Sequence, residues 1–157
     1  DPQGFLRQKD SNGNVILKKT DLDLSDVNAI KINPEEGQNI VSGSHDEMML
    51  ALQKKGIEYV LLTNKVDVSL LVKNRVYSLK LPNKTVHDTT GIGDIFCSAF
   101  TCTMLKEKDF LWALCFAAGS AQAALESNNV GLQKIPKKGM VENNASYFYN
   151  LVDFRDL

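Results

Sequence analysis

The chain has 157 residues, of which 43% are hydrophobic and 24% charged, and its formal net charge is −1. This length and composition are typical of one globular domain with a sizeable core. The lysines and arginines are scattered, which argues against a nucleic-acid partner. No apolar run approaches the roughly 20 residues of a membrane span, and no signal peptide is visible, so a membrane partner is not expected either.

The first half of the chain predicts strands with two short helices between them. An Asn-Gly turn at residues 11–14 predicts a hairpin, and the alternation at residues 27–32 predicts a strand. Pro34 lies just inside a helix start, and Ser44 with Glu47 forms a capping box that begins a second helix. Further strands are predicted at residues 58–63, 68–72 and 76–79.

The second half predicts three helices. The first runs over residues 93–106, and Asp109 caps the second, residues 110–126, which is apolar all round and so is expected to be central. A loop at residues 127–136 leads to a last helix from Lys138. Strands that alternate with helices indicate an α/β fold with a largely parallel sheet.

Three cysteines, Cys97, Cys102 and Cys115, fall in the predicted helices. An odd number without C-x-x-C spacing argues against a disulfide framework and against a zinc site. Buried free thiols in a reducing cytoplasm are the simplest interpretation.

The most informative segment is residues 88–100, D-T-T-G-I-G-D-I-F-C-S-A-F. Glycines at the mouth of a helix leave backbone N–H groups bare, and the helix dipole adds partial positive charge, which predicts a phosphate site. Asp94 places a carboxylate at the same mouth. Such a pair suits phosphoryl transfer to a hydroxyl, because the amides hold the moving phosphoryl group and the carboxylate accepts the hydroxyl proton.

This segment resembles the C-terminal signature of the PfkB/ribokinase family of carbohydrate and nucleoside kinases, D-T-x-G-A-G-D-x-F. The resemblance implies a ribokinase-like three-layer α/β/α core over residues 1–157, with Asp94 as the catalytic base. Ile92 replaces the usual alanine and crowds the pocket, although only its N–H is needed. The implied anion hole for the γ-phosphate consists of the amides of Gly91, Ile92, Gly93 and Asp94.

Asn33 and Glu36 resemble the N-x-x-E motif of the same family. The resemblance implies that they help to place Mg²⁺ through its waters, which suits a cation that prefers oxygen ligands and keeps part of its hydration shell. The alternative is plain capping of a helix by Asn33, with acids favoured by the helix dipole.

The resemblance also implies ATP contacts. Thr63 and Asn64 occupy the start of a T-x-G-x-x-G motif, although Lys65 stands where its first glycine belongs. The loop that carries Asn128 and Gly131 matches the family segment that flanks the adenine.

Asp88 and Thr90 match positions that bind a monovalent cation, such as K⁺, in several family members. A cation beside the anion hole would polarise it further. The alternative, in which Asp88 only caps and orders the loop, is equally open.

The segment Asp1 to Arg7, D-P-Q-G-F-L-R, resembles an internal strand and turn of some family members. We therefore expect the chain to be the C-terminal half of a longer kinase that is inactive by itself. Bare strand edges and apolar surface would favour a homodimer or pairing with a partner fragment.

The sequence thus predicts ATP- and Mg²⁺-dependent phosphotransfer to a hydroxyl of a sugar, polyol or nucleoside. One alternative is a non-catalytic relative that only binds nucleotide or phosphate, and another is a kinase of a non-sugar acceptor such as a vitamin precursor. The chain lacks G-x-x-x-x-G-K-[ST], which excludes a P-loop enzyme.

Overall fold

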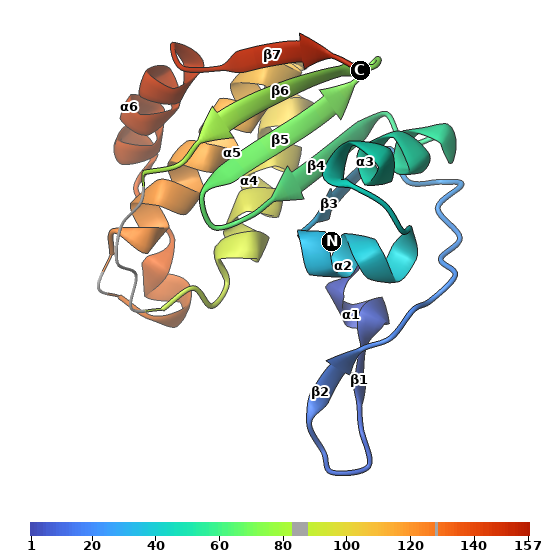
Figure 1. Cartoon of the computed structure of the whole chain (residues 1–157). Coiled ribbons are helices and arrows are strands. Elements are labelled where there is room, and N and C mark those ends of the chain that lie inside the picture. The colour runs from blue at the N-terminus through green and yellow to red at the C-terminus, as the bar shows by residue number, and fades with distance from the viewer. Residues whose placement is uncertain (83–87, 128) are drawn as a thin grey trace. The chain divides into compact units, whose positions relative to one another are not determined.

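The computed structural model describes residues 1–82, 88–127 and 129–157. The chain forms two compact units, one of Asp1–Ser78 with Phe154–Leu157 and one of Leu79–Asp153. The first unit holds most of the sheet, and the second holds three long helices (Figure 1).

The first unit begins with a short helix, α1 (Gln3–Leu6), and a hairpin of β1 (Arg7–Lys9) and β2 (Val15–Leu17). The predicted Asn-Gly turn is confirmed, with Gly13 at φ 83°. The predicted strand at the N-terminus is wrong for its first part, because Pro2 starts a helical turn there. The amides of Phe5 and Leu6 both donate to the Pro2 carbonyl, at 2.9 and 3.3 Å.

One five-stranded sheet has the order β3-β4-β5-β6-β7. Its strands are β3 (Ala29–Ile32), β4 (Tyr59–Thr63), β5 (Asp67–Val72), β6 (Arg75–Lys80) and β7 (Asp153–Asp156). β3 and β4 are parallel and β4 and β5 antiparallel, so the sheet is mixed and not largely parallel as predicted. The reason lies in the connections: a helical crossover joins β3 to β4, whereas a short turn joins β4 to β5.

The sequence did not predict β7, because all four of its residues are exposed and three are charged. Contacts with the start of β6 hold it in place. Arg75 Nε lies 2.6 Å from Asp156 Oδ1, the Arg75 guanidinium lies 5.0 Å from the centre of the Phe154 ring, and the Leu157 amide donates to the Asn74 carbonyl.

Two helices follow β3 in the first unit, α2 (Pro34–Ile40) and α3 (His45–Lys54). α3 begins with the capping box that the sequence predicts at Ser44, and α2 begins with a second capping box, formed by Asn33 and Glu36. They cover a buried cluster that includes Ile30, Ile32, Ile40, Met49, Leu52, Val60, Leu62 and Leu71.

The second unit contains α4 (Ile92–Glu107), α5 (Phe110–Leu125), a 3₁₀ helix (Gly131–Lys134) and α6 (Lys138–Tyr149). α5 packs against both α4 and α6, so its predicted central position within this unit is confirmed. Gly119 allows α6 to approach closely, since a Cβ there would lie 2.9 Å from backbone atoms of Val141 and Ala145. The Asp109 carboxylate caps α5 by accepting the amides of Leu111 and Trp112.

The three cysteines are free thiols in helices, as predicted, but they are not all buried. Cys102 is exposed, whereas burial raises the pKa of Cys115 to about 12. None of the helices in the described ranges is long and apolar enough to cross a bilayer.

Candidate active site

The first turn of α4 carries the predicted anion hole and the predicted base. Gly91 precedes the helix with φ 77° and ψ −3°, a left-handed conformation that glycine adopts without strain. No side chain in the described part of the chain caps this helix. Asp94 is exposed, and its carboxylate has no hydrogen-bond or ionic partner among the described residues.

The backbone amides of this turn differ in whether they donate a hydrogen bond. Ile92 donates a long hydrogen bond, 3.3 Å, to the Thr89 carbonyl. Within the described ranges, the amides of Gly91, Gly93 and Asp94 donate none. Three unpaired N–H groups at the positive end of a 16-residue helix form an arrangement that can hold an anion.

The residues that lead directly into α4, Asp88 to Thr90, are fixed by the Asp88 side chain and by a lysine from another segment. Asp88 Oδ1 accepts the Thr90 amide at 2.8 Å, and Asp88 Oδ2 lies 2.8 Å from Lys134 Nζ. The Lys134 ammonium, followed by the Thr90 hydroxyl and amide, holds the pKa of Asp88 well below its usual range. Asp88 and Thr90, the predicted cation ligands, are thus brought together around an ammonium group.

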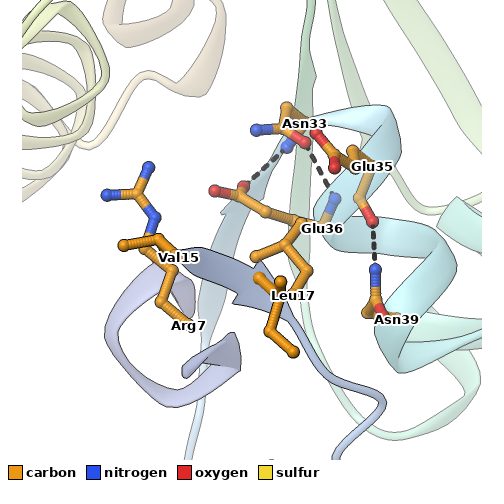
Figure 2. A pocket seen from close by; sticks show the side chains of 8 residues that line it. Arg7, Val15, Leu17, Asn33, Glu35, Glu36 and Asn39 are labelled. Atoms are coloured by element: carbon orange, nitrogen blue, oxygen red, sulfur yellow. Dashed lines mark hydrogen bonds between the residues drawn. The ribbon is translucent and has the colours of Figure 1, made fainter. Parts of the chain in front are cut away.

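Asn33 and Glu36, the predicted magnesium residues, form a reciprocal cap at the start of α2. Asn33 Oδ1 accepts the Glu36 amide at 2.8 Å, and Glu36 Oε2 accepts the Asn33 amide at 2.9 Å. Figure 2 shows that the second carboxylate oxygen of Glu36 points away from Asn33. The capping alternative is therefore confirmed as a structural role, and one oxygen is left that could accept a hydrogen bond from a metal-bound water.

A cavity of about 660 Å³ lies beside this cap in the first unit. Arg7 contributes a guanidinium to the same cavity as Glu36, so an acidic and a basic side chain face one space (Figure 2). The other lining residues are Val15, Ile16, Leu17, Asn33, Glu35 and Asn39.

The described residues contain no group of three or more His, Cys, Asp or Glu side chains that could hold a metal ion. This donor set fits a magnesium ion that is bound mainly by phosphates and water, with Glu36 as an outer partner. It does not fit a cation caged by protein carboxylates.

Thr63 and Asn64, the predicted nucleotide contacts, end β4. Among the described residues, the Thr63 hydroxyl donates a single long hydrogen bond, 3.5 Å, to the Ile32 carbonyl. The Asn64 carboxamide is committed to its own turn, because it accepts the amides of Val66 and Asp67 and donates to the Asp67 carboxylate. Thr63 is thus the freer of the two side chains.

The predicted adenine-flanking loop is partly described. Gly131 has φ 58° and begins the 3₁₀ helix. Asn129 Nδ2 donates to the Gln133 carbonyl at 3.1 Å and so ties the loop to that helix. Asn128 lies outside the described residues.

Two residues at these sites were missed by sequence reasoning. Lys134 lies in a loop predicted without secondary structure, and nothing in the sequence separates it from exposed lysines. Arg7 ends the D-P-Q-G-F-L-R segment, and that segment was the available signal. Asp1 of the segment has a structural role, since its carboxylate lies 3.0 Å from the ammonium of the buried Lys31 in β3.

A sequence model of the pfkB family carbohydrate kinases matches residues 6–138. The chain belongs to this family. The family resemblance of residues 88–100 is thereby confirmed. Among curated proteins, no significant match to the chain is found.

Solved structures show the same fold as this pfkB-family chain. A pyrophosphate-dependent kinase in the ribokinase family, complexed with a pyrophosphate analog and myo-inositol, has a TM-score of 0.73 at 19% identity, over 90% of this chain and 51% of that one. Ribokinase from Thermotoga maritima has a TM-score of 0.66 at 19% identity, over 76% of this chain and 42% of that one. Arabidopsis thaliana ribokinase with ribose and ATP has a TM-score of 0.64 at 21% identity, over 78% of this chain and 42% of that one.

These similarities confirm the ribokinase-like α/β fold. The chain spans about half the length of these structures, for example 53% and 51% of two pyrophosphate-dependent kinases.

Proposed function

We propose that this chain is the nucleotide-binding and catalytic-base portion of an ATP-dependent kinase that phosphorylates a hydroxyl of a sugar, polyol or nucleoside. The observation that carries the proposal is the uncapped start of α4, where unpaired amides and the exposed Asp94 carboxylate occupy one helical turn. Membership in the pfkB family supports the same reaction class.

In the proposed reaction, Asp94 accepts the proton of the acceptor hydroxyl while that oxygen attacks the γ-phosphorus. A new P–O bond forms, the bond to the β-phosphate oxygen breaks, and ADP leaves with the electron pair. The amides of Gly91, Gly93 and Asp94, joined by that of Ile92, hold the charge on the transferring group.

Other residues have supporting roles in this proposal. Glu36, oriented by Asn33, accepts a hydrogen bond from a water of Mg²⁺, and the ion supplies neutralisation of the phosphate charge when bound. Thr63 offers its hydroxyl to a phosphate, and the loop around Gly131 flanks the adenine. Asn64 is left out of the site because its carboxamide is already used in its turn.

A non-catalytic phosphate-binding relative is the second candidate. The observation that favours it is the turn after β4, where Asn64 closes a tight connection in place of the glycines that usually line nucleotide phosphates in this family. The exposed, unpaired Asp94 favours the kinase, because a protein that only binds phosphate gains nothing from a carboxylate beside an anion site.

The test is a panel assay on the full natural protein that carries this chain. ATP and pyrophosphate, the donors represented among the similar structures, are crossed with sugars, polyols and nucleosides, and transfer is followed by ³¹P NMR. We expect a phosphorylated alcohol with at least one pair. Saturable ATP binding without transfer to any acceptor would favour the binding protein instead.

A further inference from the structure

Lys134 is a buried lysine whose ammonium group is fully engaged with oxygen atoms. The residue is 3% exposed and ends the 3₁₀ helix Gly131–Lys134. Its Nζ lies 2.9 Å from the Asp88 carbonyl, 2.8 Å from Asp88 Oδ2 and 3.2 Å from the Thr90 carbonyl. A lysine ammonium has three hydrogens, so each of them has an oxygen partner here.

These three oxygens come from the two residues that the family resemblance assigns to a monovalent cation. Two main-chain carbonyls and one carboxylate are the oxygen ligands that a hard cation prefers. In this chain an ammonium with the same charge as K⁺ already lies among them. The residues present therefore do not fit a free K⁺ ion at Asp88 and Thr90.

We propose that the Lys134 ammonium replaces the monovalent cation, as a tethered positive charge that orders residues 88–91 before α4 and makes the anion hole independent of K⁺. The expected effect on turnover rests on the proposed kinase function. Lys134 is a positioning residue in this scheme, since it contacts the loop and not the reacting atoms.

The contacts explain how one side chain can order residues 88–91, which lead into α4. Both oxygens of the Asp88 carboxylate are used, one by the Thr90 amide and one by Lys134. Gly91, the left-handed residue that turns the chain into α4, directly follows Thr90, whose amide and carbonyl are both fixed. Because Lys134 is buried, its charge is poorly screened by solvent and salt.

A purely structural ion pair would make the same contacts, so the test needs a readout that only a cation surrogate would change. We would compare the wild-type protein at full length with Lys134→Ala, which removes the ammonium and leaves its oxygen partners. Lys138→Ala is the matched control, because Lys138 is an exposed lysine of the same region that pairs with Glu142 one helical turn away.

Thermal unfolding and turnover are measured in KCl, NH₄Cl and choline chloride at equal ionic strength. We expect the wild type and Lys138→Ala to be the same in all three salts. Lys134→Ala should lose turnover by about 10- to 100-fold in choline chloride, the usual effect of removing a positioning partner of a charged site. KCl or NH₄Cl should restore much of that loss and raise the unfolding midpoint of this variant alone.

Two results would overturn the proposal. One is a wild type whose midpoint or turnover rises in KCl over choline chloride, and this result needs no variant to fold. The other is a folded Lys134→Ala protein that no cation restores. The unfolding measurement needs no substrate, so it tests the cation inference even if the kinase assignment fails.

Discussion

The starts of α2 and α4 both carry an acid in the first helical turn, yet they use it in opposite ways. At α2, Glu36 and Asn33 satisfy each other's backbone amides, at 2.8 and 2.9 Å. At α4, no side chain caps the helix, Gly91 turns the chain in a left-handed conformation, and Asp94 is exposed without a partner among the described residues. A carboxylate that caps its own helix already uses part of its hydrogen-bonding capacity, whereas a carboxylate without a partner keeps that capacity for a ligand.

Two further helices resemble α2 in this respect. Ser44 and Glu47 form the same reciprocal cap at α3, and Asp109 accepts two amides at α5. Caps of this kind contribute about 1 kcal/mol to a helix. α4 lacks such a cap and therefore lacks this stabilisation, and its start is the one that carries the glycines and the acid of the family signature.

The strongest test of this comparison is Asp94→Asn, which removes the charge and leaves the shape. We expect kcat to fall about 10²- to 10⁴-fold with little change in ATP affinity, because the general base is lost and the amides remain. Asp109→Asn is the control, since asparagine caps a helix as well as aspartate does. Near-normal turnover of Asp94→Asn in a substrate-saturated assay would reject the base assignment.

A smaller effect is expected for Gly91→Ala, which tests the backbone of the same turn. A Cβ at Gly91 meets no atom within 4 Å, so the change acts only through the positive φ of 77°. We expect a loss of about 1–2 kcal/mol in unfolding free energy, together with a reduced kcat, because the amides that follow are displaced.

Gly56→Ala provides the control for that backbone strain. Gly56 also has a positive φ, 99°, and open space around its Cβ, but it follows α3. Its unfolding free energy in a denaturant titration should fall by a similar amount while kcat stays unchanged. Equal activity losses in the two variants would mean that the left-handed turn at Gly91 has no special role.

Glu36→Gln separates the capping role of Glu36 from a magnesium role. Glutamine also serves in a capping box, so unfolding free energy should change by less than about 1 kcal/mol. If Glu36 orients a metal-bound water, the Mg²⁺ concentration for half-maximal activity should rise about tenfold.

Glu47→Gln makes the same change in the matching cap of α3, where hydrogen bonds from the Ser44 amide and hydroxyl lower the pKa of the glutamate. A Mg²⁺ titration of this variant should be like that of the wild type. Identical titrations for Glu36→Gln and Glu47→Gln would leave Glu36 with a structural role alone.

The smallest expected effect concerns pH and the loop before α4. Lys134 is the main cause of the lowered pKa of Asp88, so the folded state binds this proton less readily than the unfolded chain, whose carboxyl has the ordinary value of 3.8. The stabilisation that the ionised Asp88 carboxylate gives to the folded state is therefore present above pH 3.8 and is lost as the pH falls further. Melting temperatures of wild type and Asp88→Asn should differ by a few degrees at neutral pH and converge in acid.

Asp21→Asn is the control for that comparison, because its carboxylate is fully exposed and lies 3.9 Å from Lys55. Its melting temperature should follow that of the wild type at every pH. A constant difference between wild type and Asp88→Asn down to pH 2 would show that Asp88 acts only through its shape.

Most helices and strands could be predicted because their signals are local. Asn33, Ser44 and Asp109 cap the helices that the sequence assigned to them, and Gly13 forms the predicted hairpin turn. β7 could not be predicted, because its residues are exposed and its contacts come from Arg75 and Asn74, far away in the sequence. The direction of β5 depended on the short turn at Asn64, where the family resemblance predicts contacts to a nucleotide.

The candidate site likewise has features that the local sequence determines and features that only folding determines. The sequence alone determined the family and placed Gly91, Gly93 and Asp94 at one helix mouth, because residues within one turn are neighbours in any helix. Only the tertiary structure decided which oxygens remained free and which were taken. Lys134 lies 46 residues from Asp88 in the chain, and an ammonium can replace a bound cation only where folding brings it among the right oxygens.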